Sequence, residues 1–153
     1  MNFVERLEAQ SSVFVEEAAA ALERQGMKHY VDSGAESTRD RMQELMDLLL
    51  ECLRGKTLLP MVKHAERVAN ERYRAGFGLE EVQTSFNVME ESLWKHLVHE
   101  APVAELAEDL GLIGTVLGAG KDQLARTYVS LASHHHAPSL DLHALFGGAA
   151  HGA

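Results

Sequence analysis

A leucine that recurs every seven residues near the end of the chain restricts the possible folds more than any other sequence feature. The repeating residues are Leu110, Leu117, Leu124 and Leu131. The intermediate positions are apolar or small, at Leu106, Ile113, Gly120 and Thr127. This spacing places one apolar face along a single long helix, about residues 103–133. Such a face suits either the core of a helical bundle or a dimer interface.

Four glycines interrupt this helix, and each costs up to about 1 kcal/mol relative to alanine in a helix interior. They are Gly111, Gly114, Gly118 and Gly120. Glycines in a helix permit either a kink or the close approach of a neighbouring helix. We favour close packing, so these positions are expected to lie against another helix.

Four more segments show helical spacing of apolar residues, and almost no strand pattern is present. They cover about residues 2–25, 38–54, 58–75 and 79–99. Aromatic residues make up only 6% of the chain, while Ala, Leu and Glu are plentiful, which favours helix over sheet. The sequence therefore predicts an all-α domain of five helices over residues 1–133. A flexible His-, Gly- and Ala-rich tail is expected over residues 134–153.

The charge balance excludes several partners. The formal net charge is −9, whereas nucleic acids and anionic membranes attract clustered Lys and Arg. No apolar run is long enough to span a membrane, and the first residues, MNFVERLEAQ, lack the apolar centre of a signal peptide. The single cysteine, Cys52, excludes an intrachain disulfide. We expect a cytoplasmic protein that binds neither nucleic acid nor membrane.

Catalytic motifs are absent from the sequence. There is no phosphate-binding glycine loop, HExxH motif, CxxC pair or nucleophile elbow. We therefore expect no enzymatic activity, no metal site and no required cofactor.

One histidine falls in an apolar pattern on the fourth predicted helix. The pattern runs through Val82, Phe86, Met89, Leu93 and His96. An inward histidine is either a core residue with satisfied hydrogen bonds or the first contact for a ligand in a pocket. We favour a partly buried histidine, without a bound metal, that borders a small pocket. A second histidine, His64, lies at the edge of the apolar face of the preceding helix. The candidate ligand-binding residues are His96, His64, Phe86 and Met89.

A dimer interface is expected on the last two predicted helices. Trp94 and Val98 lie off the apolar stripe of their helix and remain available for a second surface. Tryptophan is a common anchor of protein interfaces. The candidate interface residues are Trp94, Val98, Leu110, Leu117 and Leu124.

The segment HAERVANERYRAGFGLEEVQTSFNVMEESLWKHL, residues 64–97, resembles the N-terminal domain of RsbR-type (RsbRD) co-antagonist proteins. The shared features are an Arg-containing helix, a glycine turn, a Leu-Glu-Glu-Val helix start and a Leu-Trp pair. The upstream STRD and the late LARTYVSLA extend the resemblance over about residues 5–133.

The resemblance implies a globin-like sensor domain without haem, usually dimeric, which normally precedes an output module such as a STAS domain. The residues after 133 leave no room for such a module, so a stand-alone regulatory module that acts through an unidentified partner protein is expected. The alternative is a haem- or small-ligand-binding sensor that uses His96 and His64.

Overall fold

The computed structural model describes residues 1–136, and every regular element in that range is an α-helix. The helices are α1 (Phe3–Ala9), α2 (Ser11–Arg24), α3 (Lys28–Ser33), α4 (Ala35–Gly55), α5 (Leu59–Arg74), α6 (Leu79–Glu100) and α7 (Val103–His136). The predicted all-α class is confirmed. From residue 137 onward, the predicted flexible tail lies outside the described residues.

The predicted helix over residues 2–25 is two helices, because the chain leaves helical geometry at Gln10. Its φ of −111° and ψ of 12° separate α1 from α2. α1 begins with a capping box, in which the Asn2 side chain accepts a hydrogen bond from the Glu5 backbone and the Glu5 carboxylate accepts one from the Asn2 backbone. No glycine or proline marks the break, so apolar periodicity alone did not reveal it.

The short helix α3 lies between the predicted segments 2–25 and 38–54, where no helix was expected. Its six residues are too few to show a helical repeat in the sequence. Tyr30 is only 2% exposed and fastens α3 to the core.

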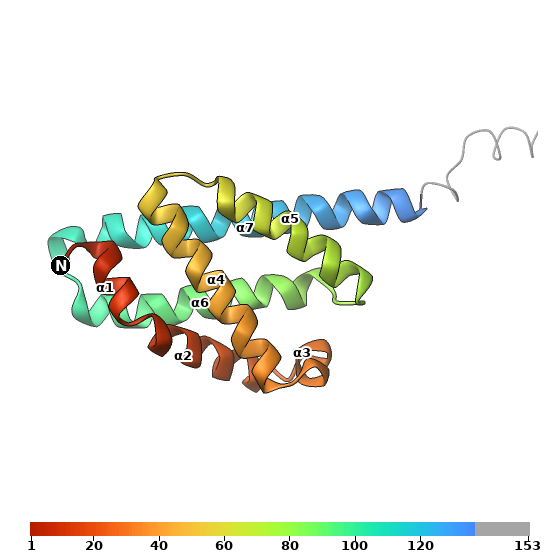
Figure 1. Ribbon diagram of the computed structural model, residues 1–153, viewed down its shortest axis with the longest axis horizontal. Helices are drawn as coiled ribbons and strands as arrows, with labels where there is room; N and C mark the ends of the chain where they lie inside the picture. The colour runs from red at the N-terminus through yellow and green to blue at the C-terminus, as the bar shows by residue number, and fades with distance from the viewer. Residues whose placement is uncertain (137–153) are drawn as a thin grey trace, which may run out of the picture.

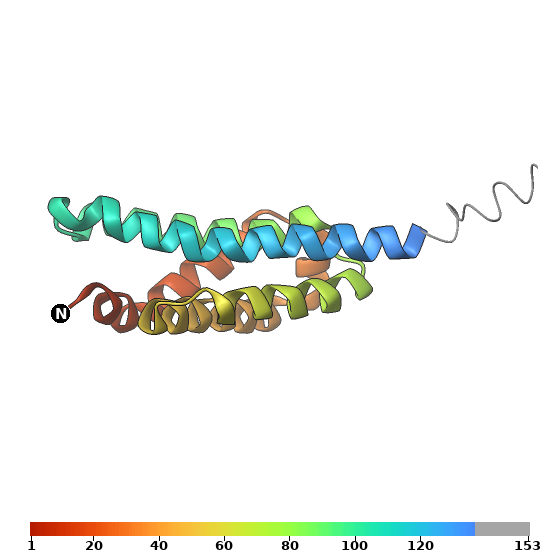
Figure 2. The ribbon, with the colours of Figure 1, turned by 90° about the horizontal axis from the view of Figure 1, so that it is seen from above.

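The helices form two layers around the core (Figures 1 and 2). α6 and α7 run antiparallel side by side in one layer, and α4 and α5 lie in the other. α7 packs mainly on α5 and α6, while α2 packs on α6 and α4. The last turns of α7 extend past the other helices (Figure 1).

The leucine repeat of α7 faces the core of its own chain. Ile113, Leu117 and Leu124 have no exposed surface, whereas Leu110 is partly buried. The prediction that Leu117 and Leu124 contribute to a dimer interface is therefore wrong, because their side chains are already enclosed by helices of the same chain.

Only one of the four glycines in α7 marks tight helix packing. A Cβ added at Gly120 would lie 2.6 Å from the Phe86 ring and 3.1 Å from Met61. A Cβ at Gly114 would make only ordinary contact with Glu90, and one at Gly111 or Gly118 would meet no atom within 4 Å. The close-packing prediction holds for Gly120 and is wrong for Gly111, Gly114 and Gly118 within the single chain.

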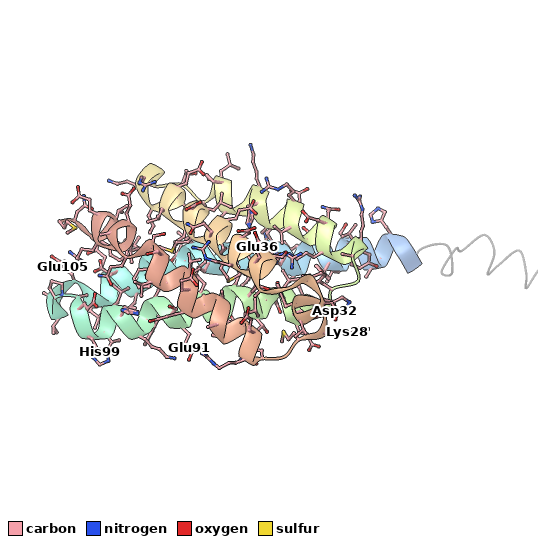
Figure 3. The ribbon with its side chains drawn as sticks, turned by 60° about the horizontal axis from the view of Figure 1, so that its bottom comes forward. Lys28, Asp32, Glu36, Glu91, His99 and Glu105 are labelled. Atoms are coloured by element: carbon pink, nitrogen blue, oxygen red, sulfur yellow. The ribbon has the colours of Figure 1, made fainter. Side chains whose placement is uncertain are left out.

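Charged side chains cover the outside of the bundle. Figure 3 shows polar side chains distributed over several helices, among them Lys28, Asp32, Glu36, Glu91, His99 and Glu105. Within residues 1–136, no helix is both long enough and apolar enough to cross a membrane.

Candidate functional site

His96 links α6 to α2 at the edge of the core instead of pointing into it. Its side chain is 23% exposed, and Nε2 lies 2.9 Å from Glu17 Oε1. Nδ1 lies 3.6 Å from Glu100 Oε1, and the imidazole meets the Phe14 ring edge-on at 5.1 Å. Leu97, which is 5% exposed, takes the inward position, so the His96 side chain does not enter the core as its register predicted, although its partial burial is as expected.

The pairing of His96 with Glu17 shifts both groups toward their charged forms. The hydrogen bond to Glu17 raises the pKa of His96 above its ordinary value, with a smaller contribution from Glu100. The same bond lowers the pKa of Glu17, helped by Ser92 and by the charge of Lys95. In its charged form the His96 imidazole pairs with Glu17 of α2 and with Glu100 of its own helix, and we call these three side chains the clasp.

Stability is therefore expected to depend on pH through this clasp. The His96 contribution is full below its unfolded pKa of 6.5 and is lost as pH rises through the higher folded value. The Glu17 contribution is present above 4.5 and is lost as pH falls through the lower folded value. Melting temperatures of the wild type and His96→Gln should therefore differ most between about pH 4.5 and 6.5.

A suitable control is His99→Gln, since His99 is exposed on the same helix. Its melting curve should follow that of the wild type across the whole range. A His96→Gln deficit that grows as pH rises from neutral to alkaline would contradict the clasp.

His64 is a core histidine with one hydrogen-bonded ring nitrogen. It is 4% exposed, and its Nδ1 accepts a hydrogen bond from Arg67 Nη2 at 3.1 Å. Glu44 Oε1 lies 3.5 Å from the same nitrogen. Burial, followed by the charge of Arg67, lowers the pKa of His64 to about 4. The imidazole is therefore neutral at physiological pH.

The four predicted ligand-binding residues do not converge on one site. His64 on α5 meets Glu44 of α4, whereas His96 on α6 meets Glu17 of α2. Phe86 and Met89 are packed in the core, with exposures of 1% and 0%. Within residues 1–136, no group of three potential metal-ligating side chains comes together.

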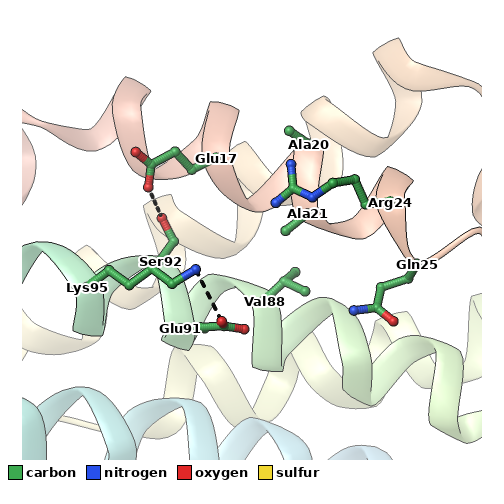
Figure 4. Close-up of a pocket in the computed structure, with 9 residues that line it drawn as sticks. All are labelled: Glu17, Ala20, Ala21, Arg24, Gln25, Val88, Glu91, Ser92 and Lys95. Atoms are coloured by element: carbon green, nitrogen blue, oxygen red, sulfur yellow. Dashed lines mark hydrogen bonds and ion pairs between the residues drawn. The ribbon is translucent and has the colours of Figure 1, made fainter.

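A polar groove of about 520 Å³ lies beside the clasp, between α2 and α6 (Figure 4). Ala20, Ala21 and Val88 border it, together with side chains of both charge signs. Ser92 Oγ donates to Glu17 Oε2 at 3.0 Å, and Lys95 Nζ pairs with Glu91 Oε1 at 3.2 Å. The charges that border the groove thus largely satisfy one another.

Phe77, in the glycine turn between α5 and α6, is the centre of a cluster that the sequence did not reveal. Its ring lies 5.1 Å from Tyr30, 5.2 Å from the Arg41 guanidinium and 6.0 Å from that of Arg72. Arg72 is 6% exposed and donates from Nη1 to the Tyr30 hydroxyl at 2.9 Å. The Phe77 carbonyl accepts a hydrogen bond from Tyr128. The turn thereby joins α3, α4, α5 and α7.

An exposed surface remains on the α6–α7 layer. Trp94 and Val98 of α6 are 47% and 49% exposed. A stripe on α7 with helical spacing contains Gly111, Gly114, Gly118 and Lys121. Lys121 Nζ reaches α6 at Glu90 Oε2, 3.2 Å away, so this stripe adjoins the exposed side of α6. We call Trp94, Val98, Gly111 and Gly118 the α6–α7 outer face.

Comparison with known proteins gives one match. A family model described as the RsbT co-antagonist protein rsbRD N-terminal domain matches residues 12–134, from α2 to the end of α7. No curated protein and no solved structure matches the chain.

Proposed function

The chain belongs to the family of RsbT co-antagonist rsbRD N-terminal domains, and from this premise we propose that it is a regulatory module that acts by protein–protein contact. The family resemblance drawn from residues 64–97 is confirmed by the match. The proposal includes a homodimer, an unidentified regulatory partner, a non-enzymatic role and a cytoplasmic location. Cys52 is a buried free thiol, which fits that location.

The α6–α7 outer face is the observation that supports this proposal best. A tryptophan that is 47% exposed is the kind of large, rigid side chain that anchors interfaces. On the adjoining helix α7, Gly111 and Gly118 each lower helix stability relative to alanine, although a Cβ at either position would contact no neighbouring helix of the chain. Because glycine has no side chain, a helix of a second copy can approach the backbone closely here. The proposed contact thus accounts for glycine at these positions.

The charges around this face suit contact between two identical copies. Glu91 and Lys95 lie close to Trp94 on α6, and Glu90 and Lys121 connect the two helices. A two-fold contact brings the same patch of both copies together, so a patch with both signs can complement itself.

A charged substitution at Trp94 is expected to abolish the dimer. At tens of micromolar, light scattering should give the mass of two chains for the wild type and of one chain for Trp94→Glu. Loss of an interface anchor costs about 2 kcal/mol or more, which is roughly a 30-fold weaker association. Burying an unpaired carboxylate adds to this loss.

The matched control is Val31→Glu, which places the same charge on α3 at a side chain that is 59% exposed. It should remain a dimer, and circular dichroism should show unchanged helicity for both variants. A wild-type protein with the mass of one chain, or a dimeric Trp94→Glu variant, would refute the proposed interface.

A further inference from the structure

An apolar groove of about 580 Å³ separates α1, the end of α4 and the first half of α7. Its apolar lining comes from all three helices and the turn after α4, at Phe3, Val4, Leu53, Leu58, Leu112 and Val116. The volume lies within the range of roughly 300–1,000 Å³ that is typical of small-molecule sites. A predominantly apolar cavity with a few polar groups at its edge is also their usual composition.

The leucines at the groove are only partly covered by the fold. Leu58 is 39% exposed and Leu112 is 43% exposed. Single exposed leucines are common on protein surfaces, but these two border the same cavity. An apolar molecule bound between Leu58 and Leu112 would cover the exposed apolar surface of both side chains.

Lys56 also borders the groove, in a backbone conformation that lysine rarely adopts. It follows the last residue of α4 with a φ of 51° and a ψ of 44°. It is the only residue other than glycine with a positive φ within residues 1–136. Glycine is the usual residue at this position of a helix end, because it has no Cβ to strain. Lysine at this position therefore carries backbone strain that glycine would avoid.

The Lys56 ammonium is available for an anionic group. Within residues 1–136 it takes part in no ion pair, although acidic residues outnumber basic ones 23 to 14 in the chain. Glu108 is the acidic residue among those that line the groove, and it comes from α7. A carboxylate in the groove is therefore attracted toward Lys56 and repelled from Glu108.

We propose that this groove binds a small carboxylic acid with an apolar body. The carboxylate pairs with Lys56 Nζ, and the apolar body lies between Leu58 and Leu112, over Leu53 and Val116. This groove is distinct from the α6–α7 outer face, and the proposal does not depend on the dimer.

Calorimetric titration of the full chain with decanoate and with decanol tests this proposal. The wild type should bind decanoate in a saturable manner. Lys56→Gly should weaken decanoate binding at least tenfold, by about 1.4 kcal/mol, and should raise the melting temperature, because glycine relieves the left-handed backbone. Glu108→Gln should tighten decanoate binding. Decanol, which has no charge, should bind the wild type and both variants equally.

Two leucine variants provide the matched test of the apolar contact. Leu112→Asn should lose both ligands, while Leu59→Asn should keep both, since Leu59 is 54% exposed but does not line the groove. The proposal is overturned if decanoate does not bind the wild type, or if Lys56→Gly binds decanoate as tightly as the wild type does. Equal binding of decanoate by Leu112→Asn and Leu59→Asn would overturn the assignment of the groove.

Discussion

Phe77→Ala is expected to lower the free energy of unfolding by about 3–5 kcal/mol, the range for removing a large aromatic side chain from a packed core. Phe77 is 6% exposed and contacts the rings of Tyr30 and His29. Its removal leaves a cavity and also takes a cation–π partner away from the partly buried Arg41 and the buried Arg72. Burial and the charge of Arg72 already lower the pKa of Arg41, so this environment is costly for two cations.

Urea denaturation followed by circular dichroism measures this loss. Phe77→Leu keeps most of the volume but lacks the aromatic ring, so it should fall between the wild type and the alanine variant. Val129→Ala, at a side chain that is 63% exposed, should change stability by no more than about 0.5 kcal/mol. If Phe77→Ala behaved like Val129→Ala, the turn would not be a junction of the fold.

Gly120→Ala and Gly118→Ala are expected to change stability in opposite directions. The new methyl group at residue 120 would lie 2.6 Å from the Phe86 ring, and Phe86 is 1% exposed and has little room to move. The variant should lose roughly 1–3 kcal/mol through overpacking, even though alanine is the better helix former. At residue 118 nothing lies within 4 Å, so alanine should gain up to about 1 kcal/mol.

Both glycine variants are best compared in the Trp94→Glu background, because Gly118 belongs to the proposed contact face. Thermal unfolding of the three proteins then reports the fold of the single chain. Shifts of the same sign for the two alanine variants would contradict the distinction between an enclosed and an open glycine.

The sequence predicted the helices that are long and regularly patterned. The segments 38–54, 58–75, 79–99 and 103–133 all correspond to helices, α4 to α7, with ends displaced by a few residues. Each of these helices buries one face. Apolar residues therefore recur at the helical spacing along that face, and polar residues occupy the others. The break at Gln10 was missed because it depends on backbone geometry that no special residue type marks.

The sites were harder to predict, because they depend on tertiary contacts. From Leu93, a helical step of three residues reaches His96 and a step of four reaches Leu97, so either could be the next inward residue. The choice depends on the position of α2, which brings Glu17 to His96. The cluster around Phe77 joins residues from four separate helices and a turn, which are distant in sequence. The leucine repeat could not distinguish the core of its own chain from an interface, since both require apolar side chains.

The fluorescence of Trp94 tests the proposed interface most directly, because it is the only tryptophan in the chain and belongs to the α6–α7 outer face. Emission and acrylamide quenching should be recorded across a dilution series, with light scattering on the same samples. If the outer face forms the dimer, emission should shift to shorter wavelength and quenching should fall as the mass rises from one chain to two. Emission and quenching that stay constant while the mass doubles would place the contact elsewhere, and a mass of one chain throughout would contradict the dimer itself.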